Sequence, residues 1–507
     1  MLWLLVAMPA ISALLAFALP WNWVRRGLLV ASAIGQVGLV AACFARQPQP
    51  VLNGWIALDA VSLLFLGITS LVFCVVCVYS VGYLARERVR MPNEPSDEVP
   101  FVNFPEAVFT GCLLMFLAAM TLVTLSHHWG LMWVAVEATT LASAPLIYFH
   151  RHPRSLEATW KYLVICSVGI ALALLGNFFL AVAARACQTT TLHLAVAELE
   201  LHARELDPLW LKAAFLLLLV GYGTKMGLAP LHTWLPDAHS EAPSVVSALL
   251  SGVLLNCAFL AILRGHALLG KAGLRDFSQD LLVLFGLASM AVAAIFLIRQ
   301  MDYKRLLAYS SVEHMGILAL GVGIGGVAGF GSMFHAVNHS LTKAMLFLAA
   351  GNTLAYFHSK STLEARGVLR VLPITGFLWI VGTLAITGSP PFGTFLSEFA
   401  ILKGMLDGSR YLVAVFYLFA LATVFLAMLA TVIPIVYGKP SAGDVPGPAA
   451  DRRLPFESSP RSASAGEPLW SVATPVLLAL AVLVLGLYLP PGLSDLLHRA
   501  AAAVGAE

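Results

Sequence analysis

Long apolar runs follow one another through almost the whole chain, and this feature constrains the fold most. A bilayer core of about 30 Å requires roughly 20 apolar residues per helical span, and about fourteen such runs occur. They cover approximately residues 2–19, 27–45, 56–84, 106–125, 129–149, 161–184, 210–235, 245–263, 280–298, 306–328, 331–357, 371–402, 411–437 and 470–490. Barrel strands are excluded because the runs are too long and do not alternate. The sequence therefore predicts an all-α polytopic membrane protein.

The composition leaves little room for a soluble domain. Of 507 residues, 59% are hydrophobic and 11% are charged, against about a quarter charged in globular proteins. The first run has no basic segment before it, so we interpret it as a helix and not as a signal peptide. The net charge of +3 comes from Lys and Arg residues between the runs, a pattern that indicates a lipid bilayer partner and no nucleic acid.

The Lys and Arg residues also predict the orientation. If the N-terminus faces outward, 18 of the 30 lie in inner loops, 10 lie in outer loops or the C-terminal tail, and two remain. Arg264 is counted in an outer loop and Lys304 in an inner loop. Inner loops carry the excess of basic residues. We therefore expect a bacterial inner (cytoplasmic) membrane protein with both termini periplasmic and an even number of spans.

Ionisable residues stand inside several apolar runs. The two remaining lysines are Lys225 and Lys343, and the carboxylates Glu137 and Glu398 lie in other runs. A charge at the bilayer centre costs about 2.5 to 3.5 kcal/mol, so such residues usually face a polar interior and mark an ion path.

One run carries three titratable groups at helical spacing. His335, His339 and Lys343 follow at i, i+4 and i+8, which predicts a single stripe on one helix. His and a desolvated Lys can exchange protons near neutral pH. The alternative is that each is a packed interior residue tied to one partner.

Two spans are interrupted by proline close to charge. Pro230 follows Lys225, and Pro390 with Pro391 precedes Glu398. Proline frees carbonyls that water or polar side chains must satisfy, and broken helices at matching places in two halves indicate a transporter site. Aligning Pro230 with Pro391 places residues 233–237 over 394–398. Kinks that only aid packing are the alternative.

The seven cysteines give no sign of a metal or redox centre. Cys74 and Cys77 form a C-x-x-C motif in mid-span, without a second pair or another ligand set. We interpret them as small buried hydrophobic residues, and we expect no metal site and no cofactor.

Four segments resemble a known family. They are Val136–Thr140, Gly223–His239, Lys304–Ser311 and Asn338–Lys343. They are similar to the antiporter-like, proton-translocating subunits of respiratory complex I, of Mrp-type cation/proton antiporters and of group 4 membrane-bound hydrogenases. The stretches 237–244 and 247–257 most resemble hydrogenase-4 component F of formate hydrogenlyase-type complexes.

The resemblance implies two inverted five-helix repeats, formed by the fourth to eighth and ninth to thirteenth helices, with broken helices 7 and 12. The expected segments are an N-terminal three-helix segment (1–105), a first repeat (106–264), a second repeat (280–437), a cytoplasmic linker loop (438–469) and a C-terminal helix (470–507).

The resemblance also implies roles for individual residues. Glu137 and Lys225 correspond to the glutamate and lysine pair of the first half, and His232 lines its broken helix. Lys343 with His335 and His339 corresponds to the central relay of the second half. His314 extends that relay, and Glu398 corresponds to the terminal exchanger.

One position departs from the family. Several relatives carry a central lysine on the eighth helix, where this chain has Asn256. Asn cannot gain or lose a proton near neutral pH. Either a water chain bridges the two halves, or the halves are poorly connected.

These expectations describe a proton-translocating membrane subunit of a multisubunit energy-converting complex, without a catalytic centre of its own. Its partners would be other membrane subunits and a soluble redox module with nickel-iron hydrogenase-like and iron-sulfur subunits. The alternatives are an inorganic-carbon uptake complex with a soluble zinc carbonic-anhydrase-like protein, an Mrp-type cation/proton antiporter, or a non-conducting scaffold. The residues leave open whether the ion is H⁺, Na⁺ or K⁺, and the direction and stoichiometry of coupling.

Overall fold

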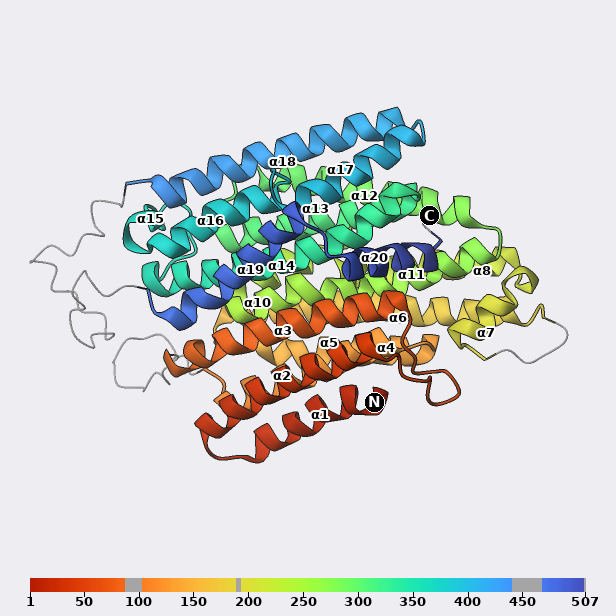
Figure 1. Cartoon of the computed structure of the whole chain (residues 1–507), viewed down its shortest axis with the longest axis horizontal. Coiled ribbons are helices and arrows are strands. Elements are labelled where there is room, and N and C mark those ends of the chain that lie inside the picture. Colours follow the sequence, from red (N-terminus) through yellow and green to blue (C-terminus); the bar gives the residue numbers. More distant parts are fainter. Residues whose placement is uncertain (87–102, 188–192, 440–466, 506–507) are drawn as a thin grey trace, which may run out of the picture.

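The computed structural model describes residues 1–86, 103–187, 193–439 and 467–505. These residues are almost entirely helical, and the only β pairings among them are isolated bridges. Figure 1 shows the long helices lying side by side along the long axis of the molecule. Eleven of the described helices are long and apolar enough to cross a membrane. The predicted all-α polytopic fold is confirmed.

The first half of the chain begins with three helices and continues into a bundle. The helices are α1 (Leu2–Ala18), α2 (Asn22–Ala45), α3 (Ala60–Arg86), α4 (Glu106–Leu125), α5 (Trp129–Ile147), α6 (Pro153–Ala184), the short α7 (Val196–Leu201) and α8 (Pro208–Met226). A 3₁₀ turn, η1 (Ala203–Glu205), precedes α8. The helix α6 packs along α8, and α4 packs against α1 and α5. This packing brings α5, α6 and α8 together around the first group of candidate site residues.

The seventh apolar run breaks as predicted. Gly227, with φ 86°, ends α8 in a left-handed conformation, which glycine adopts without a steric penalty. The chain then passes Pro230 and resumes in α9 (Trp234–Glu241). It continues as α10 (Ser244–Leu249), the π-helical turn η2 (Leu250–Leu254) and α11 (Leu255–Lys271).

The second half repeats the pattern of long helices with one break. It contains α12 (Arg275–Leu297), α13 (Tyr303–Ile324), α14 (Val327–Phe357), the short α15 (Val368–Val371), α16 (Pro373–Ile386), α17 (Gly393–Asp407) and α18 (Tyr411–Tyr437). The break between α16 and α17 contains the predicted Pro390 and Pro391. The helix α14 is central, because α3, α10, α13, α16, α17 and α19 all pack against it. Its titratable stripe is therefore enclosed by protein.

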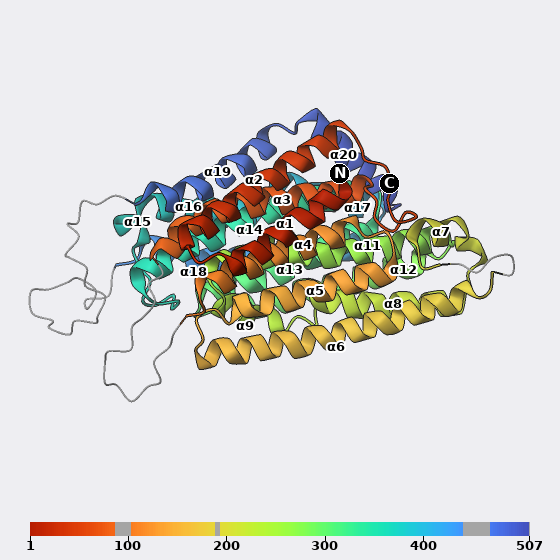
Figure 2. The same ribbon diagram turned by 90° about the horizontal axis from the view of Figure 1, so that it is seen from below.

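The C-terminal region contains two helices where one was expected. They are α19 (Leu469–Leu487) and α20 (Pro491–Ala503). The second is short and amphipathic, so a search for long apolar runs does not detect it. Both views show the two chain ends at the same end of the long axis (Figures 1 and 2). Most of the predicted linker loop 438–469 lies outside the described residues.

Of the described basic residues that were counted in loops, two are buried inside the molecule and belong to helices. Lys304 lies in the first turn of α13, where its buried ammonium donates a hydrogen bond to the Ala242 carbonyl at the end of α9. Arg264 lies within α11, where it is buried and pairs with Asp59. Their partners lie far away in the sequence, which explains why a loop count based on local composition misplaced them.

Candidate functional site

The predicted site residues fall into two groups that occupy the two halves of the molecule. Glu137, Lys225 and His232 belong to the first half, on α5, at the end of α8 and in the following break. The second-half group comes from α13, α14 and α17 and consists of His314, His335, His339, Lys343 and Glu398. The side chains of the second group and of Lys225 are buried.

Lys225 is held by hydroxyl groups. It lies in the last turn of α8, where the negative end of the helix dipole favours a cation. Its ammonium donates hydrogen bonds to Thr140 Oγ1 at 2.9 Å and to the Tyr162 hydroxyl. The Nζ atom also lies 4.4 Å from the centroid of the Tyr162 ring. The break at Gly227 therefore positions the ammonium against α5 and α6.

Glu137 reaches Lys225 through Thr140. The hydroxyl of Thr140 donates to Glu137 Oε2 at 3.3 Å, and Ser167 donates to Glu137 Oε1 at 3.3 Å. Within the described residues no ion pair joins the Glu137 carboxylate directly to Lys225. The two charges are thus connected by one intervening hydroxyl, which accepts from the ammonium and donates to the carboxylate.

His232 lies in the break beside Pro230, as expected. Its side chain is buried, and its ring centroid lies 6.2 Å from that of Tyr309 on α13. The Nδ1 atom is buried without a hydrogen-bond partner among the described residues. His232 is therefore placed between the first broken helix and the second half of the molecule.

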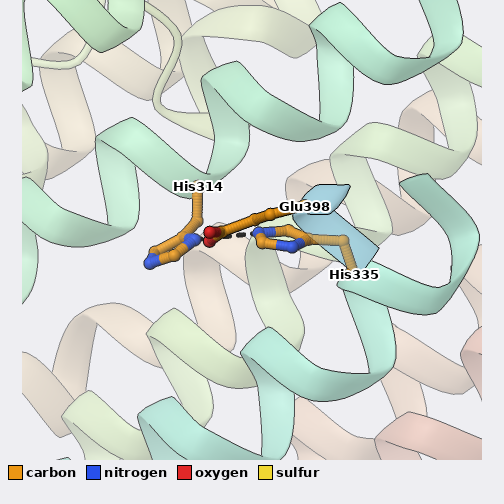
Figure 3. Close-up of side chains that lie close together, drawn as sticks. All are labelled: His314, His335 and Glu398. Atoms are coloured by element: carbon orange, nitrogen blue, oxygen red, sulfur yellow. Dashed lines mark hydrogen bonds between the residues drawn. The ribbon is translucent and has the colours of Figure 1, made fainter. Parts of the chain in front are cut away.

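Three side chains converge from three helices in the second half. His314 Nδ1 and His335 Nε2 share a hydrogen bond at 2.8 Å, and His335 Nδ1 shares another with Ser397 Oγ at 3.0 Å. A carboxylate oxygen of Glu398 and one ring nitrogen of each histidine all lie within 4.8 Å of one another. Figure 3 shows the Glu398 carboxyl group beside both rings. The three residues form one continuous polar cluster.

This cluster has the residue types of a metal site but the spacing of a hydrogen-bonded chain. Two nitrogen ligands of one tetrahedral zinc ion, each about 2.0 to 2.1 Å from it, would lie about 3.3 Å apart. The two ring nitrogens lie 2.8 Å apart and are already bonded to each other. The His314–His335 distance is therefore that of a hydrogen bond, and it is shorter than the separation of two ligands on one tetrahedral zinc ion.

Glu398 packs directly against the second break. Gly388 has φ 64°, and a Cβ atom at this position would overlap with Glu398 Oε2. Only glycine permits this approach. The other oxygen, Oε1, is buried without a partner among the described residues. The break therefore encloses the carboxyl group and leaves one of its oxygens available.

The predicted stripe on α14 does not form a continuous hydrogen-bonded wire by itself. Lys343 Nζ donates to the Leu307 carbonyl of α13 at 2.7 Å. Both ring nitrogens of His339 are buried without a partner within the described chain, and its ring lies 5.2 Å from that of His314. The helix α13 thus supplies a group at both ends of the stripe, which a reading of α14 alone could not show.

Neutral polar residues connect the two halves. Asn256 Nδ2 on α11 donates to Ser340 Oγ on α14 at 2.8 Å. One turn before it, Ser251 shares a hydrogen bond of 2.7 Å with Ser311 on α13. At the position where the family resemblance leads us to expect a lysine, this chain therefore has a polar contact that can donate and accept hydrogen bonds but cannot change its charge near neutral pH.

Two of the buried titratable residues that sequence reasoning missed interact electrostatically with Lys343. His239 on α9 is stacked on Phe347, with both ring nitrogens lacking a partner in the part of the chain described. Glu313 on α13 is 2% exposed and lies in the apolar run 306–328. The test that identified Glu137, a carboxylate within an apolar run, would also have found Glu313.

Comparisons with known proteins agree with the resemblance noted in the sequence. A family model described as NADH:quinone oxidoreductase/Mrp antiporter, transmembrane, matches residues 126–425. The hydrogenase-4 component F homolog of Methylacidiphilum infernorum (isolate V4) is 36% identical over 417 residues, which are 82% of this chain and 85% of that protein.

Two solved structures share the fold at low identity. One is a chain of the membrane-bound sulfane sulfur reductase, an archaeal respiratory membrane complex, with a TM-score of 0.81, 20% identity and coverage of 99% and 97% of the two chains. The other is a chain of the Mrp complex from Dietzia sp. DQ12-45-1b, with a TM-score of 0.81, 20% identity and coverage of 100% and 97%. The family match spans more than half of the chain and includes every candidate site residue. The protein is therefore a multi-pass membrane protein of the NADH:quinone oxidoreductase/Mrp antiporter transmembrane family, similar to hydrogenase-4 component F.

Proposed function

We propose that this chain carries protons across the bacterial inner membrane as one subunit of a multisubunit energy-converting complex of the hydrogenase-4 or formate hydrogenlyase type. The observation that supports this most is the row of ionisable side chains, nearly all buried, on α5, α8, α13, α14 and α17. Burying charge in a membrane is costly and usually marks an ion path. Three histidines, His314, His335 and His339, belong to the second-half group. Because histidine is not a typical ligand for Na⁺ or K⁺, the proton is the ion that these residues favour.

The contacts suggest an order in which protons pass from the first-half residues to the second-half group. In the first half, the Thr140 hydroxyl lies between Glu137 and Lys225. Asn256 and Ser340 link the halves. Several buried polar atoms along this axis have no partner among the described residues, and such atoms are where ordered water forms hydrogen bonds in proteins. A change of charge at one site alters the next, because Coulomb interactions are weakly screened inside the protein.

The remaining features of the proposal concern assembly and orientation. The first repeat would span 106–264 and the second 280–437, with both termini in the periplasm. The ends of the described chain lie at one end of the molecule, as this orientation requires. The partners would be other membrane subunits and a soluble redox module with nickel-iron and iron-sulfur subunits. Purification of the tagged chain with its partners tests this: a carbonic-anhydrase-like zinc protein would instead support inorganic-carbon uptake.

The experiment that tests proton transport changes the first-half pair in the whole complex. Lys225→Ala and Glu137→Gln should each reduce acidification of inverted membrane vesicles, measured with a pH-sensitive dye, while immunoblotting shows normal abundance of the complex. Lys403→Ala is the matched control, since Lys403 is an exposed lysine paired with Asp407 on the same helix. Normal acidification in both variants would refute the proposal.

A non-conducting scaffold is the rival function, and Asn256 is the observation that favours it. A scaffold has no need of a titratable residue at the junction of the halves. It predicts that Lys343→Met changes only the abundance of the complex, whereas the transport proposal predicts normal abundance with lost acidification. Measuring both quantities on the same membranes separates the two functions.

A further inference from the structure

Glu313 is a buried carboxyl group that the transfer order above does not use. It lies on α13 next to His314 and is 2% exposed. No hydrogen bond or ion pair within 4 Å is found between its carboxyl group and another described residue. An isolated buried carboxylate is costly, so its protonation must depend on charges at longer range.

Those charges come from three neighbouring helices. Glu313 interacts electrostatically with the Lys343 ammonium on α14, with the Glu398 carboxyl group on α17 and with Tyr417 on α18. Tyr417 also donates a hydrogen bond to the backbone carbonyl of Glu398 at 3.3 Å. Glu313 therefore lies within electrostatic range of both a cation and a second carboxyl group.

The helix α13 fixes this position between the two groups. The Leu307 carbonyl that accepts from Lys343 Nζ lies six residues before Glu313, which corresponds to about 9 Å along a helix. His314, which follows Glu313, is bonded to His335. Along α13, the carbonyl that binds the Lys343 ammonium is thus followed by the Glu313 carboxyl group and then by His314, which is hydrogen-bonded to His335.

We propose that Glu313 is a proton-carrying residue that connects Lys343 to Glu398, an inference that rests on the proposed transport function. In the first step a proton leaves the Lys343 ammonium and binds the Glu313 carboxylate, giving a neutral amine and a neutral carboxylic acid. This step removes two buried charges at once. In the second step the acid releases the proton through water to the Glu398 carboxylate and becomes an anion again.

The repulsion between two carboxylates supports this order. Two neighbouring carboxyl groups do not readily ionise together, so a proton on Glu313 favours ionised Glu398, and transfer to Glu398 restores the Glu313 anion. That anion then stabilises the next proton on Lys343. Glu313 would couple the lysine to the exit carboxylate in each cycle.

The test compares Glu313→Gln with Glu313→Asp in the intact complex. Glu313→Gln should lower the rate of vesicle acidification by at least about tenfold. This lower bound is set conservatively, since positioned proton-transfer groups typically contribute 10²-fold to 10⁴-fold. Glu313→Asp keeps a titratable group and should recover part of the rate. Glu364→Gln, at an exposed glutamate, is the control and should acidify like the wild type.

A second readout detects the proton itself and does not depend on transport. Infrared difference spectra of the purified complex at two pH values should show a carboxylic acid band that is lost in Glu313→Gln and kept in Glu364→Gln. Persistence of all carboxylic acid bands in Glu313→Gln would overturn the inference. So would normal acidification in Glu313→Gln when Glu398→Gln and Lys343→Met have lost it. Normal acidification in all three variants would instead overturn the proposed function.

Discussion

Replacing Thr140 with valine tests whether one hydroxyl couples the first pair of charges. Valine keeps nearly the same shape but cannot accept from Lys225 or donate to Glu137, contacts that span 2.9 Å and 3.3 Å. Hydrogen bonds to charged groups contribute about 1.5 to 3 kcal/mol. If this energy is lost from the rate-limiting transfer, at 1.36 kcal/mol per factor of ten, proton transport should fall by roughly 10-fold to 150-fold.

The neighbouring threonine provides a matched control. Thr139 is also buried on α5, but its hydroxyl donates only to the Val136 carbonyl of its own helix, at 2.6 Å. Acidification of inverted vesicles should be nearly normal in Thr139→Val, strongly reduced in Thr140→Val and largely restored in Thr140→Ser. Rates for the two valine variants that agree within a factor of two would refute the role of Thr140 as the connecting group.

Two further substitutions test the second break and the junction near the start of α3. Gly388→Ala should place a Cβ atom against Glu398 in a left-handed backbone conformation, lowering thermal stability by about 1 to 2 kcal/mol and reducing acidification; unchanged stability and transport would contradict the close approach. Burial raises the pKa of Asp59, but Arg264 and His127 outweigh this effect and hold it below its usual value. The Asp59 carboxylate should therefore stabilise the folded protein fully above about pH 4, and this stabilisation should be lost as the pH falls from there through the lowered pKa. Asp59→Asn should lower the free energy of unfolding at pH 7 by about 1 kcal/mol, because the Asp59 side chain is 38% exposed and solvent screens its ion pairs. It should also weaken this acid dependence, as measured by thermal unfolding from pH 2 to 7; an unchanged acid limb would contradict it.

The sequence was sufficient to predict the helices and both breaks because these are local properties. The length of an apolar run determines whether it can span the bilayer, and proline interrupts a helix wherever it falls in the interior. The runs 210–235 and 371–402 therefore break where Pro230 and Pro391 predicted. The amphipathic α20 was missed for the same reason, since it is neither long nor continuously apolar.

The partners of the site residues could not be predicted, because each contact joins distant parts of the chain. Tyr162 and Thr140 come from two different helices, and nothing in either local sequence indicates that they bind Lys225. Spacing correctly placed His335 and His339 on one face of α14. It did not show that His314 from α13 forms a hydrogen bond with His335.

The two buried lysines of the site, Lys225 and Lys343, differ from the peripheral ion pairs in how they are held. Arg26 and Glu106 pair directly near the starts of α2 and α4, and Lys360, in the loop after α14, pairs with Glu241 at the end of α9. Within the described residues, Lys225 and Lys343 contact only hydroxyl groups and a backbone carbonyl. A direct ion pair would hold both partners charged, because separating a proton from it leaves an unpaired charge in a low dielectric. A lysine bound by neutral acceptors keeps its hydrogen-bond partners in place while its own charge changes, and that freedom is the physical requirement for passing a proton on.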